Sequence, residues 1–206
     1  FQHSLQVANL AEEAIREIGG NELLVRVGAL YHDIGKMESM AYFTENQHGV
    51  NPHNDLEPSE SARIIIRHVI AGIEMARKAR LPEEVVDFIR THHGTSRTEY
   101  FYRKALQADP QLDDTPYRYP GPLPFTRETA VVMMADSVEA SSRSLKEFTD
   151  ESISDLINNI IDYQQEMGQF QNAPLTFKDI SLIKKVFHRK LMNIYHARIA
   201  YPEKIR

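Results

Sequence analysis

Apolar residues recur at helical spacing along most of the chain, and the strict alternation typical of β-strands is scarce. Polar residues that can cap a helix precede most of the apolar stretches. The pattern predicts helices over residues 3–18, from Asn21 to near Gly35, from Ser59, from Pro82 to Gly94, over residues 98–108, from Thr126 through VVMMADSVEA, from Asp150, and from Thr176 and Asp179 onward. Residues 41–58 and 109–125 are predicted loops. The expected fold class is all-α, a helical bundle in a single domain over residues 1–206.

The composition of the chain argues against several classes of protein function. A chain of 206 residues with 42% hydrophobic residues suits one domain with a sizeable core. The net charge of −5 argues against a general binder of DNA, RNA or membrane surfaces. Since the sequence contains no cysteine, disulfides, zinc–thiolate sites and a cysteine nucleophile are excluded. No apolar stretch approaches the ~20 residues of a membrane span. The opening Phe1-Gln2-His3, without a methionine, leads us to expect a fragment of a larger protein.

Seven potential metal ligands lie in or beside the apolar faces of these helices. They are His3, His32, Asp33, His68, His92, His93 and Asp136. A lone histidine on such a face is more often a hydrogen-bonded core residue, and a lone buried aspartate more often pairs with an arginine, for which Arg143 is a candidate. Their joint recurrence favours a metal site, because charged and polar groups are costly to bury without a partner. Imidazole and carboxylate ligands without thiolate suit Fe or Mn, with Zn or Co as substitutes.

Several motifs carry a family resemblance. The pattern His3…His32-Asp33…Asp136 resembles the HD-domain metal-dependent phosphohydrolases. The combination of HDIGK, NPHNDL, HHGTS, YRYPGP, MADSVEAS and YHARIAYP resembles the cytosolic domain of the seven-transmembrane HD family, the PgpH-type cyclic-di-AMP phosphodiesterases. The resemblance implies an HD-domain bundle with a binuclear metal site in its core. It also implies that His3, His32, Asp33 and Asp136 hold one ion, that His68, His92 and His93 hold the second, and that Asp33 bridges both.

The resemblance further implies hydrolysis of cyclic-di-AMP to 5′-pApA by a hydroxide that bridges two divalent ions, Fe or Mn. Asp33 and Lys36 are the expected catalytic residues. Lys36 is also expected to bind the phosphate, although a lysine near a helix C-terminus is favourable without any such role. Further substrate contacts are expected from Thr95, Ser96, Arg118 and Tyr119, and ordinary polarity after a helix would explain the first two equally well.

Other functions stay open at this point. A different HD hydrolase would act on cyclic-di-GMP, ppGpp or deoxynucleoside triphosphates. The cyclic-di-GMP enzymes continue after their His-His step with an acidic residue and a Gly-Tyr-Pro segment, whereas GTSRTEYFY follows His93 here. A non-catalytic cyclic-dinucleotide sensor is a further alternative. We expect a soluble fragment from the cytoplasmic face of the bacterial plasma membrane, joined to the membrane only through a missing N-terminal part, with no DNA or RNA partner; a homodimer stays open.

Overall fold

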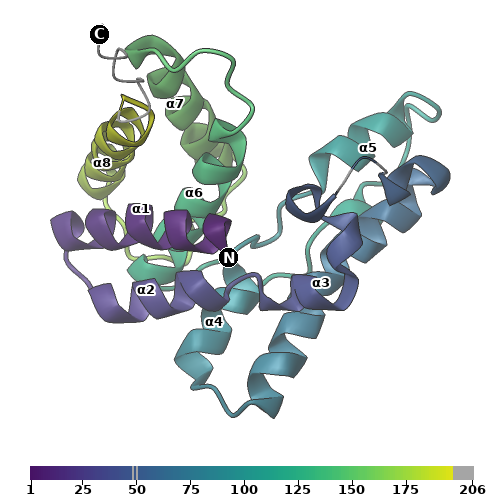
Figure 1. The fold of residues 1–206 in the computed structure, drawn as a ribbon, viewed down its shortest axis with the longest axis horizontal. Helices are drawn as coiled ribbons and strands as arrows, with labels where there is room; N and C mark the ends of the chain where they lie inside the picture. Colours follow the sequence, from purple (N-terminus) through teal and green to yellow (C-terminus); the bar gives the residue numbers. More distant parts are fainter. Residues whose placement is uncertain (48, 50, 197–206) are drawn as a thin grey trace, which may run out of the picture.

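The computed structural model describes residues 1–47, 49 and 51–196. One group of helices forms the larger hydrophobic core and is seen on one side of Figure 1: α1 (Gln2–Ile18), α2 (Glu22–Tyr31), α6 (Arg127–Ser142), α7 (Asp150–Glu166) and α8 (Phe177–His196). Helix α6 is buried on most of its surface, which is the pattern of a central helix. Apart from an isolated bridge between Arg97 and Arg118, these described residues contain no β-structure. The all-α prediction is therefore confirmed.

A second group of elements lies beside the first in Figure 1. It comprises α3 (Pro58–Lys78), α4 (Glu83–Thr91), α5 (Glu99–Leu106), and the short 3-10 helices η1 (Ile34–Tyr42), η2 (Thr44–Asn46), η3 (Pro52–Asp55) and η4 (Thr115–Tyr117). Helix α4 connects the two groups, because its Phe88 packs into the larger core while its Val86 and Ile89 form a smaller cluster with Ala76 of α3. The first residues of the chain lie between the two groups.

The starts of the helices agree closely with their predicted caps. The side chain of Asn21 accepts the backbone N–H of Leu24 at 3.0 Å, and Thr126 and Thr129 form a capping box at the start of α6. The backbone N–H and hydroxyl of Thr176 both donate to Asp179 at the start of α8. Helix α7 begins at Asp150 as predicted, with Thr149 as its cap.

The main error in the sequence prediction concerns the helix that begins after Asn21. It ends at Tyr31 rather than near Gly35, with His32 as its C-cap. Asp33 then leaves α-helical geometry (φ −102°, ψ 12°), and the chain continues as η1. The predicted loop 41–58 likewise contains short 3-10 segments. Most of the closing YHARIAYP motif lies outside the described residues.

A close backbone contact fixes the position of the segment after Asp33. A Cβ atom on Gly35 would collide with the carbonyl oxygen of His68 and with the amide nitrogen of Gly72. Only glycine at position 35 lets η1 approach α3 this closely. The contact therefore sets the distance between Asp33 and His68.

None of the helices within residues 1–47, 49 and 51–196 combines the length and the hydropathy that a membrane span requires.

Candidate metal centre

The seven predicted ligands come from five separate parts of the fold and meet in one place. His3 lies in the first turn of α1, His32 and Asp33 follow α2, His68 lies within α3, His92 and His93 follow α4, and Asp136 lies within α6. Their ligand atoms form three overlapping groups, and within each group the atoms lie within 4.8 Å of one another; the third group, His32, Asp33 and His92, joins the other two. We call His3, His32 and Asp136 the acidic half, and His68, His92 and His93 the imidazole half.

Asp33 lies between the two halves, and its two carboxylate oxygens face opposite ways. Its Oδ2 atom lies 3.5 Å from Nε2 of His3 and 3.3 Å from Nε2 of His32. Its Oδ1 atom lies 3.5 Å from Nε2 of His68 and 3.6 Å from Nε2 of His92. Each oxygen therefore faces one pair of histidines, which is the arrangement of a carboxylate placed to bridge two cations.

Asp136 completes the acidic half. Its Oδ1 atom lies 2.9 Å from Nε2 of His3 and 3.5 Å from Nε2 of His32, and its Oδ2 atom lies 3.9 Å from Nδ1 of His93. The alternative in which Arg143 pairs with Asp136 is wrong. Arg143 forms an ion pair with Glu139, one helical turn after Asp136.

Three of the histidines are held by the backbone of their own helix. Each places Nδ1 against the carbonyl oxygen three residues earlier: His32 on Ala29 (2.6 Å), His68 on Ile65 (2.5 Å) and His92 on Ile89 (2.8 Å). Donation from Nδ1–H to a carbonyl leaves the lone pair on Nε2, the atom that faces the cluster. Nε2 of His32 is fully buried and has no hydrogen-bond partner. Such a buried ring nitrogen without a partner, among imidazoles and carboxylates, fits a divalent metal ion.

The two halves differ in their protonation. Burial opposes the charge on His3, but its hydrogen bonds to Asp136 and Glu139 outweigh burial and raise its pKa to about 9. Burial also opposes the charge on His32, and the carboxylates of Asp33 and Asp136 raise its pKa to about 10. Burial would raise the pKa of both aspartates, but the neighbouring histidines hold those pKa values well below their usual range.

In the imidazole half, the pKa values of His68 and His93 shift in the opposite direction. Burial lowers the pKa of His68 to about 4, and the charge of Asp33 compensates only in part. Burial, and then the neighbouring His92, lower the pKa of His93. The imidazoles of His68 and His93 are therefore neutral at pH 7, as metal ligands must be.

Lys36 lies at the edge of the cluster, beside a pocket. Its Nζ atom is 2.7 Å from Oδ2 of Asp33 and 5.0 Å from the centre of the Phe43 ring. The pocket has a volume of about 540 Å³, and its lining includes Asp33, Lys36 and the exposed side chains of Met37 and Met40. The predicted catalytic pair thus faces a space large enough for a ligand.

The other predicted substrate contacts divide into two groups. The Tyr119 ring is buried and stacks on His93, with ring centres 4.1 Å apart. Thr95 and Ser96 follow His93 of the imidazole half closely in sequence, but their hydroxyls have other partners: Oγ1 of Thr95 accepts from Gln169, and Oγ of Ser96 donates to the carbonyl of His93. Tyr119 therefore touches the cluster, whereas the hydroxyls of Thr95 and Ser96 bond to groups other than the ligand side chains.

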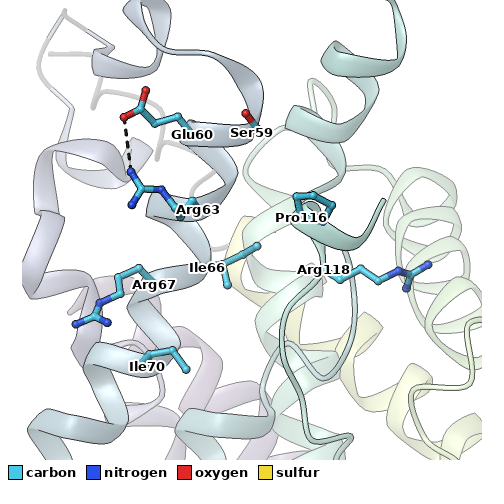
Figure 2. A pocket seen from close by; sticks show the side chains of 8 residues that line it. All are labelled: Ser59, Glu60, Arg63, Ile66, Arg67, Ile70, Pro116 and Arg118. Atoms are coloured by element: carbon cyan, nitrogen blue, oxygen red, sulfur yellow. Dashed lines mark ion pairs between the residues drawn. The ribbon is translucent and has the colours of Figure 1, made fainter. Parts of the chain in front are cut away.

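Arg118 belongs to a different surface. Its guanidinium donates to both carboxylate oxygens of Asp114 and to the carbonyl oxygen of Thr95. It lines a groove of about 620 Å³ between α3 and η4, and Figure 2 shows its side chain extending away from Arg63 and Arg67 of α3. None of the seven ligands lines this groove. The fold thus does not bring Arg118 to the cluster.

Sequence reasoning missed Glu139. This buried carboxylate lies 2.5 Å from Nδ1 of His3 through its Oε2 atom. The available signal was its position in MADSVEAS, one turn after Asp136 and therefore on the same face of the helix.

Fold and site define the class of this chain. The family model of the HD domain matches residues 1–141, and the chain belongs to this family. The resemblance expected from the motifs is confirmed in its finer form as well. The chain is 45% identical over 204 residues to the cyclic-di-AMP phosphodiesterase PgpH of Bacillus subtilis, and 43% identical over 204 residues to PgpH of Listeria monocytogenes.

These alignments cover 98% of this chain but only 29% and 28% of the two relatives, so the chain spans less than a third of their length. A solved structure agrees with the sequence matches. The HD domain of L. monocytogenes PgpH, in complex with cyclic-di-AMP, superposes with a TM-score of 0.92 at 42% identity. That match covers 95% of this chain and 92% of the other. Membership of the HD family implies dependence on a divalent metal, and the histidine and aspartate cluster is consistent with it.

Proposed function

We propose that residues 1–206 form an HD phosphohydrolase domain that hydrolyses cyclic-di-AMP to 5′-pApA. The observation that carries the proposal is the position of Asp33, whose two oxygens face the histidines of the two halves. A phosphodiester is the substrate class that a two-ion site suits. The similarity to the PgpH proteins, and to a PgpH HD domain in complex with cyclic-di-AMP, supports this particular diester.

Two divalent ions per chain, Fe or Mn, are part of the proposal. The acidic half together with Asp33 would hold one ion, and the imidazole half together with Asp33 would hold the other. When bound, the two ions supply a nucleophile from water at neutral pH and neutralise charge on the phosphate. The donor set of five imidazoles and two carboxylates supports Fe or Mn.

The remaining roles belong to side chains around the cluster. Lys36, which lies 2.7 Å from Asp33 and lines the adjacent pocket, would contact a phosphate oxygen. Tyr119 would orient His93 through their stacked rings and exclude water from that side. Met37 and Met40 expose an adaptable apolar surface in the same pocket, suited to a purine base.

Thr95, Ser96 and Arg118 act indirectly in this proposal. Arg118 donates to the carbonyl oxygen of Thr95, and Gln169 holds the amide and the hydroxyl of Thr95. These bonds would fix the turn that follows His93. In the whole protein, the domain would lie at the cytoplasmic face of the bacterial plasma membrane.

The test is turnover by protein reconstituted with Mn²⁺ or, without oxygen, with Fe²⁺. We expect cyclic-di-AMP to yield 5′-pApA, measured by chromatography, at a higher kcat/KM than cyclic-di-GMP, ppGpp or a deoxynucleoside triphosphate. Tight binding of cyclic-di-AMP with no 5′-pApA over hours would instead identify a sensor. One tightly bound ion with triphosphate turnover would identify a different HD hydrolase.

A further inference from the structure

The ligand histidines are held in two different ways. The first way is shared by His32, His68 and His92. In each of them, Nδ1 meets the carbonyl oxygen of the residue three positions earlier in the same helix. His3 lies in the first turn of α1, after the N-cap Phe1. Its Nδ1 atom is held by a side chain instead of a backbone carbonyl oxygen.

A remote carboxylate takes the place of that carbonyl. Oε2 of Glu139, 136 residues away in α6, lies 2.5 Å from Nδ1 of His3. The other oxygen, Oε1, accepts two hydrogen bonds from Arg143, at 2.8 Å and 3.1 Å. Glu139 is only 6% exposed. Each carboxylate oxygen of Glu139 thus has its own partner, and the side chain cannot rotate without breaking both contacts.

We infer that Glu139 is the positioning residue for His3 at the ion site of the acidic half, and that Arg143 fixes Glu139. The inference rests on the proposed function, because it requires a divalent ion at that site. Donation from Nδ1–H of His3 to the carboxylate fixes the tautomer in which Nε2 carries the lone pair. The negative charge of Glu139 also makes Nε2 a stronger donor to the ion.

The effect should be confined to one ion. The imidazole half has no contact with Glu139, and His68 and His92 keep their backbone acceptors. Loss of an outer-shell carboxylate typically weakens metal binding by about 10–100-fold. The expected signature is therefore a selective weakening of one of two ions, which a general packing defect would not produce.

Glu139→Gln is the sharpest variant, because glutamine keeps the shape but has a single acceptor oxygen. It cannot accept from both His3 and Arg143, so an amide NH₂ group must face one of these donors. Mn²⁺ binding is followed by the electron paramagnetic resonance signal of free Mn²⁺, with circular dichroism as the check of folding. We expect about 10–100-fold weaker binding of one ion, near-normal binding of the other, and an altered pH dependence of the weakened ion.

The matched control is Glu128→Gln, the same substitution in the same helix, where the carboxylate accepts from the backbone of Asn21. It should bind both ions as the wild type does. If Glu139→Gln does not fold, Arg143→Gln decides, since Arg143 is 42% exposed at its side chain and its replacement should weaken the same ion by a smaller factor.

Normal affinity for both ions in Glu139→Gln, or in Arg143→Gln if only that variant folds, would overturn the inference while the proposed function stands. A wild-type protein that binds no divalent ion would overturn both.

Discussion

The two halves of the candidate metal centre use the same imidazole chemistry, yet they differ in charge. In the acidic half, carboxylates surround His3 and His32 and raise the pKa of His3 to about 9 and that of His32 to about 10. In the imidazole half, burial dominates and lowers the pKa of His68 to about 4. The position of the carboxylates, rather than the burial common to all these residues, therefore decides whether a histidine of this site carries a proton.

This difference has a consequence for metal binding. An ion that enters the acidic half must displace protons from His3 and His32, whereas His68 and His93 of the imidazole half are already neutral at pH 7. The acidic half offers Asp136 and the outer carboxylate of Glu139 beside Asp33, whereas the imidazole half shares Asp33 and meets Asp136 only at 3.9 Å from His93. We therefore expect unequal affinities for the two ions, with Asp33 as the one ligand on which both depend.

Asp33→Ala should have the largest effect, because it removes the group common to both halves. We expect loss of both ions by elemental analysis. We also expect at least ~10³-fold lower kcat for cyclic-di-AMP, since several kcal/mol of charge stabilisation would be lost and each 1.4 kcal/mol is about tenfold in rate. A variant that keeps either the ions or the activity near the wild-type level would contradict the bridging position.

A pair of variants can separate the halves. Asp136→Asn should remove the ion of the acidic half, and His93→Ala should remove the ion of the imidazole half. Each affected ion should bind weaker by more than the ~10–100-fold typical of outer-shell losses, because a direct ligand is gone. Titration with Mn²⁺ should show one remaining tight ion in each variant. If both variants lose both ions together, the two halves do not act as separate sites.

Some parts of the fold and the site were predictable from sequence, and others were not. The seven candidate ligands, which the fold brings together, were recognisable because each is a polar residue in or beside an apolar face. The starts of helices were predictable since caps such as Asn21 and Thr126 act within three residues. The end of α2 was not, because the apolar pattern continues through Ile34 although the helix stops at Tyr31. The contact between Gly35 and His68, which is formed only in the folded chain, holds that break in place.

The pattern of apolar and polar residues could not predict contacts between residues that are far apart in the sequence. Glu139 meets His3 across 136 residues, and nothing near either residue specifies the other. Arg118, which family resemblance assigned to the substrate, differs in this respect, because it is bonded to Asp114 only four residues earlier. A sequence identifies groups that need a partner, whereas the fold determines which partner they find.

Lys36→Met tests whether the cation beside Asp33 serves the phosphate or only the carboxylate. If Lys36 contacts a phosphate oxygen, kcat should fall by roughly 10²-fold, as for loss of a donor to a developing charge. Metal affinity should stay equal or rise, because a positive charge 2.7 Å from a ligand oxygen is removed. A control is Lys78→Met, at the exposed end of α3, with no expected change. Equal activity of both variants would assign Lys36 to the support of Asp33 alone.

The smallest expected effect is on the pH dependence of the metal-free protein. Because the pKa values of His3 and His32 are raised from 6.5 in the folded state, their contribution to stability is complete below pH 6.5 and is lost as the pH rises through about 9 and about 10. The melting temperature of the metal-free protein should therefore fall between pH 7 and pH 10. His68, whose pKa is lowered to about 4, is neutral in both states over that range, so His68→Gln should keep this slope and His3→Gln should reduce it.

Added Mn²⁺ should raise the melting temperature more at pH 8.5 than at pH 6.5, since fewer protons then compete for the acidic half. A Mn²⁺ effect that is independent of pH would show that the two halves do not differ in protonation.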